Sequence, residues 1–218
     1  MIFIYPYKRK DNDFLIQHSI KCVLKYYPEA RCITVGDEVE DIENIPFKDS
    51  LKIKGSNVTA KCLYVGQFFD EFVYMNDDFF INERFDFDTP CHSLERLERK
   101  EGKASIAWQV SVDNTLHWLE HNNLSAYSYE CHQPILFNSA KLFQTMEQID
   151  WKNNEHFVKS LYGNGNHTGD EFKAIENVKL IKPDIKKANL CLTMYGCFSV
   201  GQGFMTEAGA NFIKQLSE

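Results

Sequence analysis

An apolar run of residues ends at two adjacent acids in the stretch Phe72-Val73-Tyr74-Met75-Asn76-Asp77-Asp78-Phe79-Phe80. Residues 72–75 are apolar at every position, which is typical of a central strand in a parallel sheet that is covered on both faces. Carboxylates beside such a strand are costly to bury unless a cation pairs with them. Two interpretations follow. The acids hold Mn²⁺ or Mg²⁺, which prefer oxygen ligands, or they belong to a polar turn, where Asn and Asp are favoured.

Strand-like and helix-like segments alternate on the N-terminal side of this stretch. Short apolar runs predict strands at residues 2–7, 31–35 and 51–53, and apolar residues at helical spacing predict helices at residues 14–27 and 57–69. The polar residues 38–50 predict a loop. This alternation predicts an α/β fold with a mostly parallel sheet flanked by helices.

Three short segments follow predicted strands, at residues 6–8, 36–37 and 76–78. Ligands of doubly wound α/β folds bind beyond the carboxyl ends of the parallel strands. We therefore expect these three segments to converge on one ligand site.

The second half of the chain is less regular. Residues 104–112 and 190–200 are strand-like, residues 114–121, 134–149 and 207–216 predict helices, and residues 163–166 predict a turn or mobile loop. No internal repeat or low-complexity linker divides the sequence. The pattern favours a single domain, residues 1–218, with a smaller elaboration in its second half.

The composition narrows the function classes. The net charge of −7 argues against general nucleic-acid coating, although basic clusters at residues 8–10, 96–103 and 182–187 leave DNA open as a specific partner. The seven Cys residues form no C-x-x-C pair, so zinc-ribbon spacing is absent. No apolar run reaches the roughly 20 residues of a membrane span. The first basic residues follow an apolar segment instead of preceding it, which is unlike a signal peptide and favours a cytoplasmic protein.

The stretch around the two acids resembles a known motif. Residues 73–80 are similar to the Asp-any-Asp strand end of nucleotide-diphospho-sugar transferases with the GT-A fold, and they resemble the Tyr-Leu-Asn-Asp-Asp-Phe-Phe motif of the Stealth family of sugar-phosphate transferases. Asn114-Thr115, followed by residues 131–137, resembles the Stealth segment with a His-any-Pro pattern, so the resemblance covers residues 73–170. Stealth proteins open with a Tyr-Thr-Trp motif and an acid. Residues 3–8 carry no acid, so plain glycosyl transfer is the expected chemistry.

The resemblance implies a GT-A-like domain in which residues 1–88 form the nucleotide-sugar-binding half and residues 89–218 form the acceptor-side half. It implies a metal-dependent glycosyltransferase, using Mn²⁺ or Mg²⁺, that moves a sugar from a nucleotide-sugar, with UDP as the expected nucleotide, to a hydroxyl acceptor. The acceptor is either a surface glycan or the hydroxymethylated bases of phage DNA. Two alternatives remain: a Stealth-like sugar-phosphate transferase, and a non-catalytic module that binds a nucleotide or a glycan.

The two acceptors make different structural demands. DNA predicts that the basic clusters gather on one face beside Asp78 and that activity falls steeply with salt. A glycan predicts an aromatic-lined groove and little salt dependence. Trp108, Trp118 and Trp151 are the candidate stacking residues for such a groove, although core packing is the ordinary role of a Trp.

The expected site residues come from the motif, the strand ends and the resemblance. The catalytic candidates are Asp77, His132 and Asp170, with His132 as acceptor base or metal ligand. The metal candidates are Asp78, Asp77 and His167, the last on a glycine-rich loop that could fold over the donor. The donor-binding candidates are Tyr5, Pro6, Tyr7, Lys8, Arg9, Asp37, Lys61 and Asn76, and the two cations at residues 8–9 suit a diphosphate.

Several of these candidates also have a purely structural interpretation. Tyr5 and Tyr7 either stack on a pyrimidine base or pack as core aromatics. Asp37 either accepts a hydrogen bond from the base or ribose, or is a turn residue. Lys61 either faces the donor or is a surface lysine. His132 is either functional or an ordinary structural histidine, and residues 165–170 are either a closing loop or an exposed turn.

Overall fold

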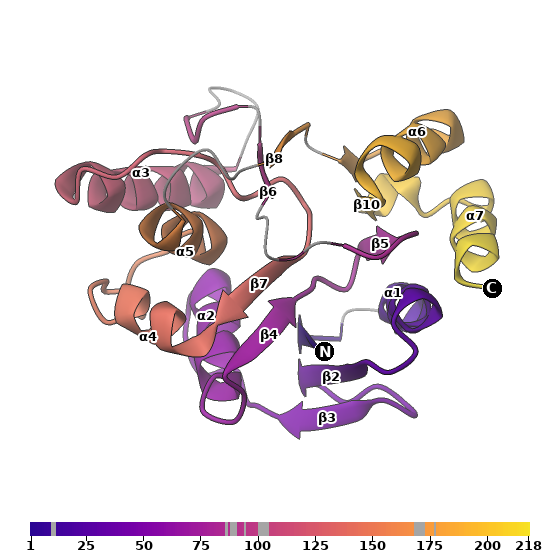
Figure 1. The fold of residues 1–218 in the computed structure, drawn as a ribbon, viewed down its shortest axis with the longest axis horizontal. Coiled ribbons are helices and arrows are strands. Elements are labelled where there is room, and N and C mark those ends of the chain that lie inside the picture. Colours follow the sequence, from indigo (N-terminus) through magenta and orange to yellow (C-terminus); the bar gives the residue numbers. More distant parts are fainter. Residues whose placement is uncertain are drawn as a thin grey trace.

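The computed structural model describes residues 1–9, 12–85, 87, 91–93, 95–99, 105–167, 173–176 and 178–218. Its main sheet has five strands in the order β3-β2-β1-β4-β7 (Figure 1). These strands are β1 (Ile2–Tyr7), β2 (Arg31–Gly36), β3 (Glu43–Pro46), β4 (Glu71–Tyr74) and β7 (Ile135–Asn138). Neighbouring strands are parallel except for β7, which pairs antiparallel with β4 at the edge.

The strand order reverses beside β1. The chain runs from β1 outward to β2 and β3, and then returns to place β4 on the other side of β1. Strand ends separate at such a switch point, so the space beyond the carboxyl ends of β1 and β4 is where a doubly wound sheet binds ligands. The acids at the end of β4 therefore lie in this region.

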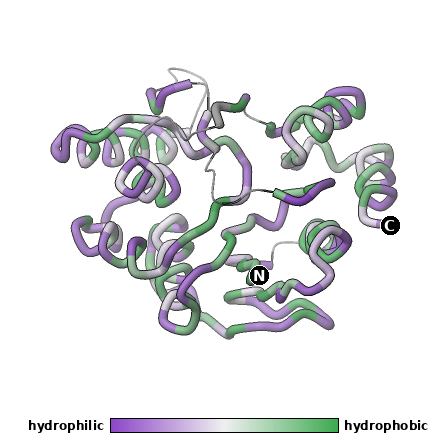
Figure 2. Tube along the Cα trace, in the orientation of Figure 1, coloured by the Kyte–Doolittle hydropathy of each residue, from purple (hydrophilic) through white to green (hydrophobic). Residues whose placement is uncertain are grey.

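One helix covers each face of the parallel strands. Helix α1 (Phe14–Tyr26) shares a hydrophobic cluster with Phe3 and Tyr5 of β1, and helix α2 (Lys54–Val65) shares another with Ile4. This division follows from the period of two residues along a strand, which sends successive side chains to opposite faces. Along these helices hydrophobic and hydrophilic residues alternate, as expected for helices that bury one side (Figure 2).

A second sheet lies on the α1 side of the molecule. It has the order β5-β10-β9, formed by β5 (Phe79–Ile81), β10 (Cys197–Val200) and β9 (Lys179–Leu180). Helices α6 (Ile185–Tyr195) and α7 (Glu207–Ser217) contribute to the same core cluster as α1, and a short 3-10 helix spans Gln202–Phe204. The backbone N–H of Val200 donates to the carbonyl of Asp78 at 3.3 Å, so this sheet is joined directly to the acidic segment.

The remaining elements lie on the other side of β4 and β7 (Figure 1). They are α3 (Ile106–His121), α4 (Ser139–Met146), α5 (Val158–Asn166) and a parallel two-stranded sheet of β6 (Cys91–Ser93) and β8 (Lys173–Ile175). None of the described helices is both long enough and apolar enough to cross a bilayer.

The predicted α/β class with a mostly parallel, helix-flanked sheet is confirmed. The strand expected at residues 51–53 is wrong, because the third strand is β3, inside the expected loop at residues 38–50. Residues 43–46 pair with Ile33 to Gly36 of β2 at the edge of the sheet. A short edge strand is only half covered, so its polar residues do not carry the apolar signature of a strand.

Several expectations for the second half are also wrong. Residues 106–112, expected as a strand, begin α3, whose N-terminus is capped by the Ser105 side chain accepting from the backbone of Trp108. The helix expected at residues 134–149 divides at Asn138, which is the last residue of β7 and caps α4 with its side chain. The strand expected at residues 190–200 divides at Gly196, whose φ of 66° ends α6 before β10. Residues 163–166 lie within α5.

Candidate active site

A cavity of about 370 Å³ lies beyond the carboxyl ends of β1 and β4, beside the first turn of α2; we call it the strand-end cavity. Its walls contain most of the predicted donor and metal residues. These are Pro6, Tyr7, Lys8, Arg9, Lys61, Asn76, Asp77 and Asp78, and the further lining residues are Asp49, Lys54, Asn57, Val58 and Lys179. The convergence of strand ends expected from the sequence therefore occurs for the segments after β1 and β4.

Lys61 is a buried structural cation in this cavity wall. Its side chain is 3% exposed, and its Nζ donates to the Tyr7 carbonyl at 2.9 Å and lies 2.9 Å from Asp49 Oδ1. The ammonium therefore connects the end of β1 to the segment that contains Asp49. Gly36 leaves room for this arrangement: its φ is +121°, and a Cβ there would lie 2.8 Å from Lys61 Nζ and would overlap the Tyr7 carbonyl.

Arg9 is held by acids of the protein. Its guanidinium makes a bidentate contact with Asp13 at 2.9 and 2.7 Å, and Nη2 also donates to the Glu38 carbonyl at 2.6 Å. The hydrogen bonds from Arg9 hold the pKa of Asp13 below its usual range. Tyr7 Oη donates to the same carboxylate at 2.7 Å, while burial, followed by this contact, raises the pKa of Tyr7. This network fixes the rim of the cavity.

Two of the donor-binding candidates lie outside the cavity wall. Tyr5 is 1% exposed in the core beneath α1, with its Oη 3.3 Å from Ser19 Oγ, so the core interpretation fits it. Asp37 is exposed and accepts a hydrogen bond from the Arg9 backbone at 2.8 Å. Its carboxylate thus connects the residues after β2 to those after β1.

The acidic segment joins three parts of the molecule. Asn76 accepts a hydrogen bond from Tyr74 Oη at 2.6 Å, and Asp78 Oδ2 lies 3.8 Å from Lys179 Nζ of β9. Asp77 and Asp78 also line a neighbouring cavity, of about 600 Å³, which extends toward α1 and residues 200–205. Lys179 was not predicted as a site residue. It is far from Asp78 in the sequence, and the two residues meet because β9, β10 and β5 pair in one sheet.

Two carboxylates at a cavity mouth fit a hard cation that takes its other ligands from substrate oxygens. Among the described residues, no three His, Cys, Asp or Glu side chains lie together as a metal-binding group. The predicted third ligand, His167, is elsewhere: its ring contacts Tyr129 and Tyr162 at the end of α5, with centroids 6.4 and 5.7 Å away. His167 therefore does not line the cavities that contain Asp77 and Asp78. The catalytic candidate Asp170 lies outside the described residues.

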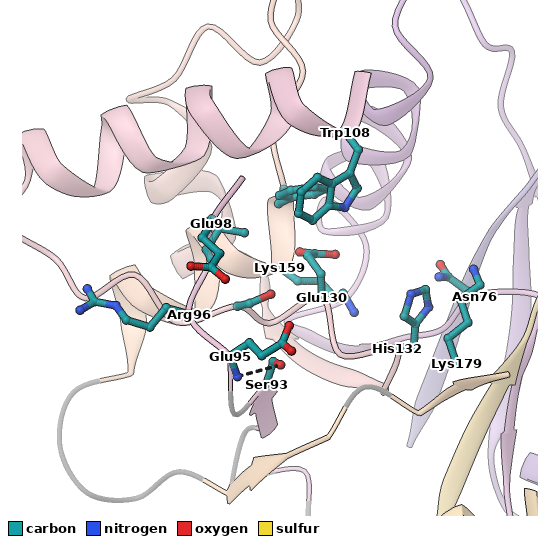
Figure 3. Close-up of a pocket in the computed structure, with 13 residues that line it drawn as sticks. Asn76, Ser93, Glu95, Arg96, Glu98, Trp108, Glu130, His132, Lys159 and Lys179 are labelled. Carbon is teal, nitrogen blue, oxygen red and sulfur yellow. Dashed lines mark hydrogen bonds between the residues drawn. The ribbon is translucent and has the colours of Figure 1, made fainter. Parts of the chain in front are cut away.

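A second cavity, of about 310 Å³, meets the first at Asn76 and Lys179; we call it the helix-side cavity (Figure 3). Its walls come from the β6 segment, α3, the segment before β7, and α5. The lining residues are Asn76, Ser93, Glu95, Arg96, Leu97, Glu98, Trp108, Ser128, Glu130, His132, Phe157, Lys159 and Lys179. Of these only Asn76, Trp108 and His132 were candidates from the sequence, since residues from separate segments carry no shared local pattern.

His132 lines the helix-side cavity, with its ring edge-on to that of Phe79 at a centroid distance of 6.3 Å. Its backbone φ of 60° is unusual for a residue other than Gly. Burial, reinforced by the charges of Lys179 and Lys159, lowers the pKa of His132 to about 3. The imidazole is therefore neutral near pH 7, and its role as acceptor base or metal ligand stays a prediction.

No protein-family model matches the chain, and no curated protein matches it. The resemblance to the Stealth family therefore stays an expectation. Among solved structures, the crystal structure of the galactosyltransferase LgtC in complex with donor and acceptor sugar analogs is similar, with a TM-score of 0.54 and 13% identity over 100% of this chain and 95% of that chain. An active-site mutant of LgtC gives 0.51 and 12% over the same shares. At these identities the likeness shows the fold alone, and this chain shares the GT-A fold of LgtC.

Proposed function

We propose that the protein is a metal-dependent glycosyltransferase that moves a sugar from a UDP-sugar to a hydroxyl group of an acceptor. One observation carries the proposal: Asp77 and Asp78 lie at the switch point of the sheet, at the junction of cavities large enough for small ligands. The fold shared with a galactosyltransferase that binds donor and acceptor sugar analogs supports it.

The strand-end cavity has the chemistry of a diphosphate site. Lys8 and Lys54 line it, and the N-terminal end of α2 contributes Lys54, Asn57 and Val58 to its wall. Backbone N–H groups at a helix N-terminus favour anions. In this proposal the donor diphosphate lies between these groups and the two acids.

Asp77 and Asp78 would hold Mn²⁺ or Mg²⁺ together with oxygens of the donor, and a metal there neutralises the diphosphate as it leaves. Lys179, 3.8 Å from Asp78, adds positive charge on the same side. Tyr74 orients Asn76 through its 2.6 Å hydrogen bond, so the amide is positioned next to the acids.

Calorimetry with UDP and a panel of UDP-sugars, in Mn²⁺ and in EDTA, tests the donor site. We expect metal-dependent binding that is reduced at least about a hundredfold in Asp78→Ala, because one of the two proposed carboxylate ligands is lost. The matched control is Asp70→Ala, since Asp70 is exposed and precedes the opposite end of β4. A folded protein that binds none of these nucleotides in either buffer would exclude a UDP-sugar donor.

Product analysis separates glycosyl transfer from the sugar-phosphate transfer implied by the Stealth resemblance. Glycosyl transfer breaks the bond between the anomeric carbon and the diphosphate oxygen, and it releases UDP. Sugar-phosphate transfer breaks the bond within the diphosphate, and it releases UMP. We expect UDP in chromatograms of reactions with the preferred donor, and UMP as the only nucleotide product would contradict the proposal.

A further inference from the structure

The helix-side cavity opens beside the strand-end cavity but differs from it in chemistry. The two share Asn76 and Lys179, so a ligand in one lies next to a ligand in the other. A volume of about 310 Å³ is at the lower end of the range for small-molecule sites. A group bound here would thus approach the donor from the side of α3 and α5.

An aromatic surface forms one wall of the helix-side cavity. Trp108 projects from α3 toward the space that contains Glu130 (Figure 3). Its ring lies 5.7 Å from that of Phe157, and both residues line the cavity with the buried Leu97. The flat indole ring of Trp108 suits the apolar face of a sugar ring, and its N–H adds a hydrogen-bond donor.

The helix-side cavity is also lined by carboxylates. Glu95, Glu98 and Glu130 line the cavity, and Glu130 is held by Ser160 Oγ, which is fully buried and donates to it at 3.1 Å. An ionised carboxylate only accepts hydrogen bonds, so it favours ligands that carry several O–H or N–H groups. It repels the phosphates of a nucleic acid.

The cationic side chains that line the helix-side cavity are Arg96, Lys159 and Lys179. Lys159 is 5% exposed, with its Nζ 3.5 Å from the Gln133 carbonyl and 5.6 Å from the ring centroid of Phe79. The Arg96 side chain points away from Trp108 and Glu130 (Figure 3). Lys179 lies on the side shared with the strand-end cavity, near Asp78. No basic face suited to a DNA backbone is thus formed by the described residues around this cavity.

We propose that the helix-side cavity binds a neutral sugar unit of the acceptor, with its ring on Trp108 and its hydroxyls donating to Glu130. This inference rests on the proposed function, and it selects a glycan over DNA as the acceptor. Trp108 and Glu130 are specificity residues for the acceptor, and they take no part in holding the UDP-sugar.

The test uses the full chain with UDP and Mn²⁺. Its binding to neutral oligosaccharides is measured on an array. Its binding to a DNA duplex that contains 5-hydroxymethylcytosine is measured by fluorescence anisotropy. We expect binding to a subset of the oligosaccharides that changes little with salt. Glu130→Gln and Trp108→Ala should each weaken it about tenfold or more, because a charge-assisted hydrogen bond or the stacking surface is lost. Trp108→Phe should retain most of the binding.

The control for charge is Glu147→Gln, an exposed residue at the end of α4 that should leave glycan binding unchanged. Thermal melting checks that each variant is folded, and Glu130→Gln, for which a loss of binding is expected, keeps the inference falsifiable if Trp108→Ala unfolds. Calorimetry with UDP runs in parallel. UDP binding without binding to any oligosaccharide, glycan binding that survives Glu130→Gln and Trp108→Ala, or salt-sensitive duplex binding would overturn this inference alone. If the unaltered protein does not bind UDP at all, the proposed function itself is contradicted.

Discussion

The two cavities that meet at Asn76 and Lys179 are built differently. The strand-end cavity takes most of its wall from the end of β1, the residues that follow β1 and β4, and the N-terminal half of α2, and several of its charged groups pair with one another. The helix-side cavity draws its wall from several separate segments between residues 76 and 179. Changes in the first should therefore affect folding and donor binding together, whereas changes in the second should affect ligand binding more than stability.

The largest effect on stability is expected for Gly36→Ala. The φ of +121° is strained for Ala, and the added methyl group would overlap the Tyr7 carbonyl and lie 2.8 Å from Lys61 Nζ. We expect the free energy of unfolding, measured in urea, to fall by about 3 kcal/mol or more, with UDP affinity reduced as well. The control is Gly165→Ala, an exposed helical position whose Cβ would have its nearest neighbour at 3.6 Å. Equal stability of the two variants would show that the strand-end cavity tolerates rearrangement.

A smaller loss is expected for Lys61→Met, which leaves Asp49 without its buried partner. Removing one member of a buried ion pair is strongly destabilising, but Asp49 is 21% exposed, so we expect about 2 kcal/mol. The double variant Lys61→Met with Asp49→Asn should recover part of this loss, because no uncompensated charge then remains. A double-mutant cycle of urea unfolding measures the coupling. Additive losses would mean that the pair does not stabilise the end of β1.

His132, which lines the helix-side cavity, should make the stability of the fold sensitive to acid. The pKa of His132 is about 3 in the folded protein, below its ordinary value of 6.5, because of burial and the charges of Lys179 and Lys159. Folding therefore favours the neutral ring. The stability that this provides is complete above about pH 6.5 and is lost as the pH falls toward 3.

His132→Asn keeps a residue that tolerates a positive φ and removes the titrating group. Between pH 7 and pH 4.5, we expect the unaltered protein to lose on the order of 2–3 kcal/mol more unfolding free energy than this variant. Urea unfolding at the two pH values gives the difference. His18, His156 and His167, whose pKa values are also lowered by burial, remain in both proteins and cancel in the comparison. Parallel stability curves would contradict the assignment.

Much of the strand-end cavity could be predicted from the sequence, because its signals are local. The apolar run before Asn76 marks a covered central strand, and a parallel sheet brings the ends of its strands to one edge. Together these two facts place Asp77, Asp78 and residues 6–9 at a common site without any knowledge of distant contacts. The predicted α/β class has the same origin, since it depends on the alternation of strand and helix periods along the chain.

Tertiary structure alone decided how the predicted side chains are used. Tyr5 and Tyr7 are two residues apart on one strand and face the same side, yet only Tyr7 reaches the cavity, because α1 covers Tyr5. The sequence marked Lys61 as a cation near the donor or on the surface. Only the packing of α2 against β1 shows that it is buried and paired with Asp49.

The helix-side cavity was decided almost entirely by tertiary structure. Trp108, Glu130 and Lys159 come from separate segments, and no periodicity relates them. Lys179 reaches Asp78 only because β9 joins a sheet with β10 and β5. Hydrophobic periodicity reports which face of one element is buried, but it does not report which elements meet. The sequence by itself therefore determined the sheet and the acids at its edge, and the packing of α3, α5 and β9 around them determined the second binding surface.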